Sequence, residues 1–209
     1  AVLGEERGQK IVPGLVEVLE DPEPLLQLTA AESLGRIGDP SAVKALVALL
    51  DSAEKEVRLK AASALGKMPV PESVSAMSEH FPEEKNLFVR IQILQSLKDL
   101  AQMITSEDQR LAVEKMALLL LEDPESGIRL AAAELLLAVP ENNEEQSVIP
   151  MIAKMAFAGG GDQRLETGRM LRKVNPESAS AVFLNILADP KQESHHRVAI
   201  EALQEIHRI

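Results

Sequence analysis

The stretch AAESLGRIGDPSAVKALVALLDSAEKEVRLKAASALGKMP, residues 30–69, contains nearly the same five residues twice. Ala-Glu-Ser-Leu-Gly at 31–35 returns as Ala-Ser-Ala-Leu-Gly at 62–66, 31 residues later. Between the copies the apolar residues follow a helical period, and Asp-Pro or a short polar segment separates the helical segments. The stretch therefore predicts a repeating unit of two helices joined by a short turn.

The second helix of this unit recurs six times along the chain of 209 residues. Each copy closes with Leu eight positions after its first residue, and a second pattern of apolar pairs, three residues apart, runs in step with it. Such parallel patterns indicate a repeat array, because a two-helix unit can bury its apolar face only against its neighbours. We therefore expect an all-α fold, an α-solenoid of about six two-helix repeats in a single domain over residues 1–209. The units are expected at about 9–38, 41–69, 72–105, 109–139, 144–175 and 178–209.

Two local expectations concern the second and third units. Ser41 follows an Asp-Pro pair and is expected to cap the first helix of the second unit. The third unit is longer than its neighbours, and its second helix is expected to extend over residues 86–103.

The composition excludes several classes of function. The chain has no Cys, so it has neither a thiolate nucleophile nor a disulfide framework. A net charge of −11 with no Trp and no Tyr argues against nucleic acid, which favours basic and aromatic surfaces. No apolar run is long enough for direct membrane insertion. We expect a chain that is monomeric in isolation, with protein partners and a cytoplasmic location.

The second position of the six copies is polar, most often Arg, and has two interpretations. These residues could face a ligand, or they could form a structural ladder in which each bonds an acidic side chain or a carbonyl group of the neighbouring unit. A guanidinium suits such fixed bridges, and a position that recurs in every unit is more typical of structure. We therefore predict a structural ladder. Its members are Gln27, Arg58, Arg90, Arg129, Arg164 and His196.

Positions one turn further along the second helices are candidates for a partner-facing surface. Their charges are mixed in sign, with a basic end in the fifth unit. They could form a solvated helix face or a groove for a partner, and the sequence leaves both interpretations open. The candidates are Glu32, Arg36, Ser63, Lys67, Gln95, Asp99, Glu134, Arg169, Lys173, Glu201 and Glu205.

No motif in the sequence indicates catalysis, a cofactor or a metal. Gly159-Gly160-Gly161-Asp162 lacks the Lys-Ser/Thr and the preceding strand of a phosphate loop. His195 and His196 are adjacent, so on a helix they point about 100° apart and are poorly placed to share one ion. The polar segment 141–145 is more typical of a solvated linker than of a docking epitope.

The segments 31–40 and 42–46 resemble the HEAT repeat, and most closely the bacterial HEAT-like subtype that also occurs in phycobilisome lyases. The resemblance covers residues 9–209 as six units. It implies a solenoid whose second helices line a concave binding surface, and only a minority of such proteins carry chemistry.

We therefore expect a non-catalytic protein–protein interaction scaffold or adaptor domain. Because the chain begins at Ala1 and ends without a polar capping helix, we expect it to be part of a longer chain. Two alternatives stay open: an accessory subunit of a bilin lyase, and a regulatory domain of a larger enzyme or transporter.

Overall fold

A computed structural model of the chain describes residues 11–104, 106–139, 149–150, 152–153, 157, 161–174 and 176–208. The regular structure of these residues is helical throughout, and they contain no strand. The predicted all-α class is therefore confirmed. The chain divides into two compact units, residues 1–116 with 138–140 (unit 1) and residues 117–137 with 141–209 (unit 2). None of the described helices is both long and apolar enough to cross a bilayer.

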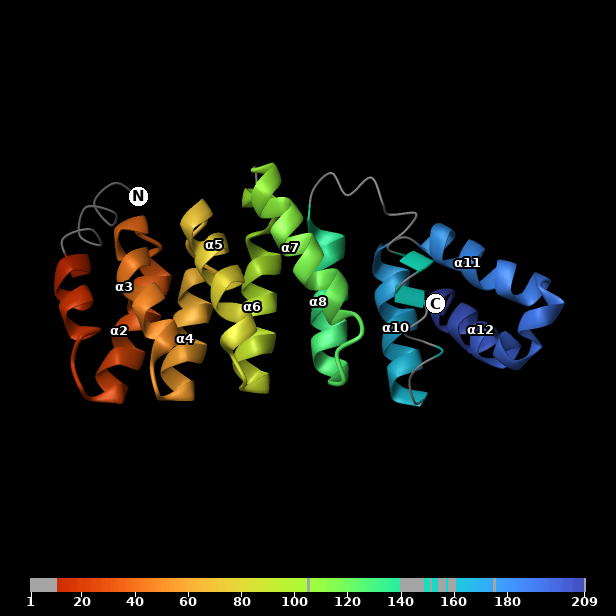
Figure 1. Ribbon diagram of the computed structural model, residues 1–209, viewed down its shortest axis with the longest axis horizontal. Coiled ribbons are helices and arrows are strands. Elements are labelled where there is room, and N and C mark those ends of the chain that lie inside the picture. Colours follow the sequence, from red (N-terminus) through yellow and green to blue (C-terminus); the bar gives the residue numbers. More distant parts are fainter. Residues whose placement is uncertain are drawn as a thin grey trace. The chain divides into compact units, whose positions relative to one another are not determined.

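Unit 1 consists of helices that alternate between the first and second positions of successive repeats (Figure 1). After a helix over residues 11–18 come α2 (Pro24–Ile37), η1 (Pro40–Ala42), α3 (Val43–Ala48), η2 (Leu49–Asp51), α4 (Lys55–Leu65), α5 (Pro71–His80), η3 (Phe81–Glu83), α6 (Leu87–Asp99), η4 (Ala101–Met103) and the first part of α7 (Glu107–Leu120). The η segments are single 3₁₀ turns. Unit 2 contains the end of α7, α8 (Ser126–Ala138), α10 (Gly161–Val174), α11 (Pro176–Ala188), η5 (Pro190–Gln192) and α12 (Glu193–Ile206).

Asp-Pro pairs mark four of the turns between helices, and they share one geometry. The Asp carboxylate accepts a hydrogen bond from the backbone N–H two residues later, while the intervening Pro fixes its own φ angle. Asp39 bonds the N–H of Ser41 in this way and caps η1, so the expectation that Ser41 is the cap is wrong. The four donor–acceptor pairs are Glu23 to Asp21 (2.8 Å), Ser41 to Asp39 (2.9 Å), Glu125 to Asp123 (2.9 Å) and Lys191 to Asp189 (3.0 Å).

The second helices of unit 1 pack in a tight row in which α4 lies between α2 and α6 (Figure 1). Glycines allow this approach. A Cβ atom on Gly35 would lie 2.9 Å from the Cα of Ala64, and one on Gly66 would lie 2.6 Å from the Cβ of Ser96. The Ser96 hydroxyl also donates a hydrogen bond of 3.0 Å to the carbonyl oxygen of Ala62. Small residues at these contacts therefore allow the backbones of α2, α4 and α6 to approach one another closely.

The Leu that closes each second helix is a recurring core residue. It is buried in five copies and half-buried in the sixth, at Leu203. Removing the surface of a fully buried Leu from water contributes about 1.5–3 kcal/mol, so each of the buried residues stabilises the fold by about this amount. The five buried members are Leu34, Leu65, Leu97, Leu136 and Leu171.

The third unit departs from its expected form. Helix α6 ends at Asp99 and does not extend to residue 103, because Leu100 has φ −90° and ψ 0° and leaves the helical path. The 3₁₀ turn η4 follows, and the chain becomes extended at Ile104. Leu100, Ala101 and Ile104 are all buried in this segment.

Candidate protein-interaction surfaces

The side chains at the second position of the second helices extend back to the turn that precedes their own helix. Helical side chains point toward the N-terminus, and the last carbonyl groups of the first helix lack partners within that helix. The recurring carbonyl acceptors therefore lie in the same repeat and not, as expected, in the neighbouring one. The hydrogen bonds run from Gln27 to Leu19 (3.1 Å), from Arg58 to Ser52 (2.8 Å) and Ala53 (3.1 Å), from Arg129 to Asp123 (2.6 Å) and Pro124 (2.9 Å), and between His196 and Asp189 (3.3 Å).

Arg58 also bridges to the next repeat through Glu84. Its Nε lies 2.7 Å from one carboxylate oxygen and its Nη2 lies 3.2 Å from the other, and the N–H of Asn86 donates to the same carboxylate at 2.7 Å. Glu84 is almost completely buried. Burial raises the pKa of Glu84, but Arg58, the N–H of Asn86 and nearby His80 lower it more, so the net pKa lies below its ordinary value.

The other ladder residues have related contacts. The guanidinium carbon of Arg90 lies 5.1 Å from the ring centre of Phe81, a cation–π distance. Arg164 in unit 2 approaches Glu201 of the following second helix at 3.5 Å. These contacts favour the interpretation of the second position as a structural ladder, which stays a prediction until side chains are removed.

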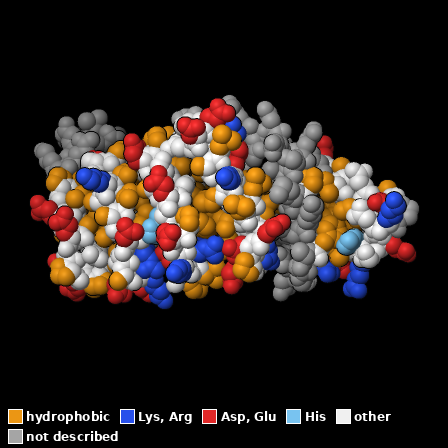
Figure 2. All heavy atoms as spheres, in the orientation of Figure 1, with side chains coloured by type: hydrophobic (Ala, Val, Ile, Leu, Met, Phe, Trp, Pro, Cys, Tyr) orange, Lys and Arg blue, Asp and Glu red, His pale blue; other side chains and the backbone are white. Residues whose placement is uncertain are grey.

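In unit 1 the predicted partner-facing positions lie on the outer surface of the second helices. Glu32, Arg36, Lys67, Gln95 and Asp99 are exposed and Ser63 is half-buried. On the face of unit 1 that Figure 2 shows, acidic, basic and hydrophobic side chains are interspersed.

Glu32 lies close to cationic side chains. Its carboxylate lies 3.2 Å from the Lys60 ammonium group. The hydrogen bond and the charge of Lys60, with more distant contributions from Arg36 and Lys67, lower the pKa of Glu32. Because the pair is exposed to solvent and salt, it contributes little to stability.

In unit 2 the second helices α10 and α12 hold two carboxylates between four guanidinium groups. Glu205 lies 3.1 Å from Arg169 on α10 and 3.3 Å from Arg208 beyond α12. One turn earlier, Glu201 pairs in the same way with an arginine of each helix, at 3.5 Å from Arg164 and 3.0 Å from Arg197. Both glutamates have a lowered pKa: for Glu201 the largest cause is the hydrogen bond from Arg197, and for Glu205 the raising effect of burial is outweighed by the bonds from its two arginines.

Glu205 is buried, whereas the sequence analysis placed it on the exposed face. The reason is Gly168 on α10, where a Cβ atom would lie 2.9 Å from the Cβ of Glu205. The missing side chain brings α12 so close that the stem of Glu205 is covered. Of the other predicted positions, Arg169 is exposed, Glu134 and Glu201 are half-buried, and the side chain of Lys173 lies outside the described residues.

One surface of unit 2, the α10/α12 arginine surface, consists of Arg164, Arg169, Arg172, Arg197 and Arg208 with Glu201 and Glu205. Arg172 donates to the backbone carbonyl of Arg208 at 2.9 Å, and the other four arginines share two carboxylates. A pocket of about 570 Å³ adjoins it, and Arg164, Leu165, Gln204 and Arg208 line part of its wall. Sequence reasoning missed Arg172, Arg197 and Arg208, although the i, i+4 spacing of Arg197 and Glu201 was a signal.

The three histidines near the end of the chain contact different groups. His195 lies edge-on to Phe157, with ring centres 5.1 Å apart. His196 contacts the carbonyl oxygen of Asp189, and the Nε2 of His207 lies 2.9 Å from the Ser180 hydroxyl. In the part of the chain that the structure describes, no three His, Asp or Glu side chains are grouped to hold a metal ion. The polar segment 141–145 and the glycines at 159–160 lie outside that part.

Comparison with known proteins places this architecture among helical repeat folds. Residues 12–98 match the family model described as HEAT repeats. An engineered protein of known structure is 21% identical, with a TM-score of 0.56, over 94% of this chain and 98% of its own. A designed armadillo repeat protein is 17% identical, with a TM-score of 0.53, over 94% of this chain and 100% of its own. No curated protein matches the sequence.

A further similar structure is that of computationally designed armadillo repeat proteins for modular peptide recognition. It is 17% identical, with a TM-score of 0.53, over 91% of this chain and 99% of its own. The predicted α-solenoid fold is thereby confirmed, and residues 12–98 are similar to HEAT repeats.

Proposed function

We propose that this chain is a non-catalytic scaffold that binds an acidic segment of a partner protein on the α10/α12 arginine surface. The observation that supports the proposal is a group of five described arginines beside a pocket, four of which pair with only two carboxylates. The repeat fold supports the broader role, because stacked helix pairs offer long preformed surfaces to other proteins.

The chemistry of the surface suits carboxylate groups of a ligand. A guanidinium presents several N–H donors in a plane, and one or two of them bonded to Glu201 or Glu205 leave others available for a second carboxylate. The side chains of Arg169 and Arg208 are 55% and 66% exposed, so their remaining donors face solvent. The internal glutamates also hold the arginines in place before the ligand arrives, which reduces the rotamer entropy lost on binding.

The chain as a whole has a net charge of −11, and this charge repels an acidic partner at long range. Local attraction by the arginines must overcome that repulsion. We therefore expect modest affinity and, because exposed ion pairs are screened, a decrease in affinity as salt concentration rises.

Fluorescence anisotropy can measure the binding of two labelled peptides to the chain. One peptide alternates Glu and Ser, and the other has Gln in place of every Glu. We expect the chain to bind the Glu peptide in preference to the Gln peptide. The double substitution Arg172→Gln with Arg208→Gln should weaken Glu-peptide binding about tenfold, since two charge-assisted contacts are lost.

The choice of substitutions follows from the structure. Arg169 is left in place because its reversal would set a carboxylate against the buried Glu205 and destabilise the helix pair. The matched control is Lys55→Gln with Lys115→Gln, which removes the same charge from exposed positions of unit 1. Equal binding of the two peptides, or equal loss in the arginine and lysine variants, would refute the proposal. The bilin-lyase and regulatory-domain alternatives stay predictions.

A further inference from the structure

We infer that the groove between α3 and α5 is a second binding site, which accepts a partner segment carrying an apolar side chain next to a basic one. The groove lies between first helices of unit 1, whereas the α10/α12 arginine surface belongs to second helices of unit 2. Its ligand also has the opposite charge, so the inference goes beyond the proposed function.

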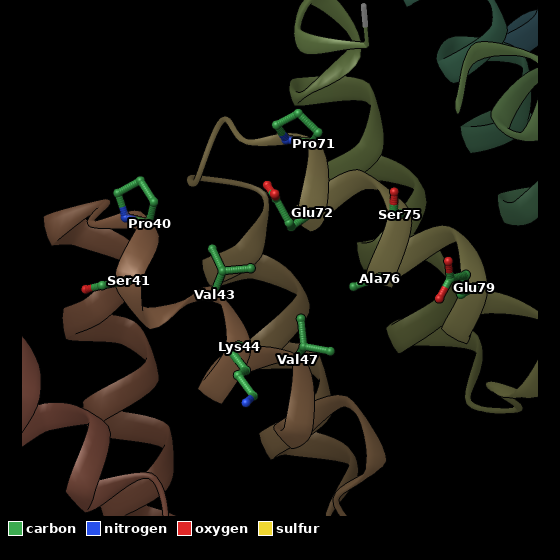
Figure 3. A pocket seen from close by; sticks show the side chains of 10 residues that line it. All are labelled: Pro40, Ser41, Val43, Lys44, Val47, Pro71, Glu72, Ser75, Ala76 and Glu79. Atoms are coloured by element: carbon green, nitrogen blue, oxygen red, sulfur yellow. The ribbon is translucent and has the colours of Figure 1, made fainter. Parts of the chain in front are cut away.

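The groove has a volume of about 560 Å³ and an aliphatic lining. Figure 3 shows Val43 and Val47 on α3 and Ala76 on α5 between the two helices. The rings of Pro40 and Pro71, at the starts of η1 and α5, add apolar surface near one end. The volume is within the usual range of binding pockets, about 300–1,000 Å³, and suits one or two aliphatic side chains.

The groove is open for reasons that are visible in the sequence. Helix α3 has only 6 residues and lies between two 3₁₀ turns, and α5 faces it with the small residues Ser75 and Ala76. In the other row, Gly35 and Gly66 allow close approach of the second helices. The second helices are thus tightly packed. Between the first helices α3 and α5, the side chains are too small to fill the space, and a groove remains.

Charges at the edge of the groove select the ligand. Glu72 and Glu79 lie on α5, and their spacing of seven residues places them about 10 Å apart along the helix. Lys44 on α3 is the cation that lines the groove with them. All three side chains are exposed, and among the described residues none of them forms an ion pair. Two uncommitted carboxylates against one ammonium group favour a ligand with a positive charge.

These positions define the ligand more closely. Ala76 lies between Glu72 and Glu79 in the sequence of α5, so an apolar side chain seated against Ala76 is flanked by a carboxylate on each side. Lys and Arg have long stems, and either residue reaches one of these carboxylates from one or two positions away in an extended segment. We therefore assign the groove to a segment in which Leu or Ile has Lys or Arg as a near neighbour.

The test uses two peptides that share a Leu-Leu centre, one flanked by Arg and the other by Glu. Each is titrated into the ¹⁵N-labelled chain while amide chemical shifts are recorded. We expect the Arg-flanked peptide to shift the amides of Val43, Val47 and Ala76 in a saturable way, and the Glu-flanked peptide to bind at least about tenfold more weakly. Absence of saturable shifts at these amides, or equal binding of both peptides, would overturn the inference.

Two pairs of variants locate the binding. Ala76→Trp fills the groove and should abolish the shifts, whereas Ala112→Trp at an exposed position of α7 should not. Glu72→Lys should weaken binding of the Arg-flanked peptide about tenfold, whereas Glu56→Lys, also in the first turn of a helix, should leave it unchanged. If Ala76→Trp fails to fold by circular dichroism, the glutamate pair decides. Self-association of the chain that Ala76→Trp removes would identify a second copy as the occupant and overturn the assignment to a partner segment.

Discussion

Glu84 joins two neighbouring repeats through a carboxylate that is almost completely shielded from water. Its oxygens accept hydrogen bonds from Arg58 in the preceding repeat and from the N–H of Asn86 in its own. A buried charge is tolerated only when it is paired and hydrogen-bonded. The junction between these repeats therefore depends on the ionised form of one side chain.

Replacement of Glu84 by Gln should make stability less dependent on pH in the acidic range. The pKa of Glu84 in the folded chain lies below its ordinary value of 4.5, so its contribution is fully present above pH 4.5 and is lost as the pH falls through the folded-state pKa. We expect Glu84→Gln to cost about 2 kcal/mol at pH 7 and progressively less below pH 4.5. Urea unfolding at a series of pH values measures this difference.

The comparison isolates Glu84 because other carboxylates with lowered pKa values are the same in both proteins. Glu83→Gln is the matched control, since Glu83 is the exposed neighbour of Glu84. A difference between wild type and Glu84→Gln that stays constant from neutral to acidic pH would show that the carboxylate charge is not what stabilises the junction.

At the scale of helices, glycine determines how closely the second helices pack. Gly35→Ala should destabilise the chain by about 1–2 kcal/mol, because the new Cβ would lie 2.9 Å from the Cα of Ala64 and overpacking outweighs the better helix propensity of Ala. Gly14→Ala is the control in another helix, where nothing lies within 4 Å of the new atom, and it should stabilise by about 0.5–1 kcal/mol. Thermal unfolding of the two variants should give shifts of opposite sign. Two stabilised variants would mean that the helices can separate at no cost.

The helices themselves were predictable, because their determinants are local. The closing Leu column and the Asp-Pro turns follow from periodicity and turn chemistry, and both are found in the structure. Three features were not predictable from the residues alone: the end of α6 at Asp99, the burial of Glu205 and the groove between α3 and α5. The end of α6 depends on the backbone conformation of Leu100, and the other two features depend on the distance between helices, which the sequence period does not encode.

The arginine surface was predicted only in part for the same reason. Arg169 and Glu201 were candidates because they share a helix face with equivalent residues of other repeats. Arg172 and Arg208 were not, because their contact joins side chain to backbone across two helices 36 residues apart. Comparing the repeats identifies positions that are equivalent in each repeat, whereas this surface is formed by contacts between non-equivalent positions.

At the scale of the whole molecule, a net charge of −11 coexists with a local group of five described arginines in unit 2. The two compact units raise the question of whether the chain unfolds as the single domain expected from the sequence. In repeat arrays each unit contacts mainly its neighbours, so a local loss of stability need not spread.

Leu171→Ala should therefore affect unit 2 alone. The side chain is fully buried in α10, and its truncation should cost about 2–5 kcal/mol there. Hydrogen exchange measured by mass spectrometry should show faster exchange in α10, α11 and α12 and unchanged exchange in α2, α4 and α6. Leu65→Ala should give the reverse pattern. Equal acceleration throughout the chain in either variant would instead indicate one cooperative domain.

The unequal packing of the two rows in unit 1 has a mechanical consequence. The row of α2, α4 and α6 is already in close contact and resists compression, whereas the space between α3 and α5 can narrow or widen. Elastic bending of unit 1 is therefore concentrated in the first-helix row, with the glycine contacts as its pivot. A partner side chain bound between α3 and α5, as proposed above, would act as a wedge and would stiffen unit 1.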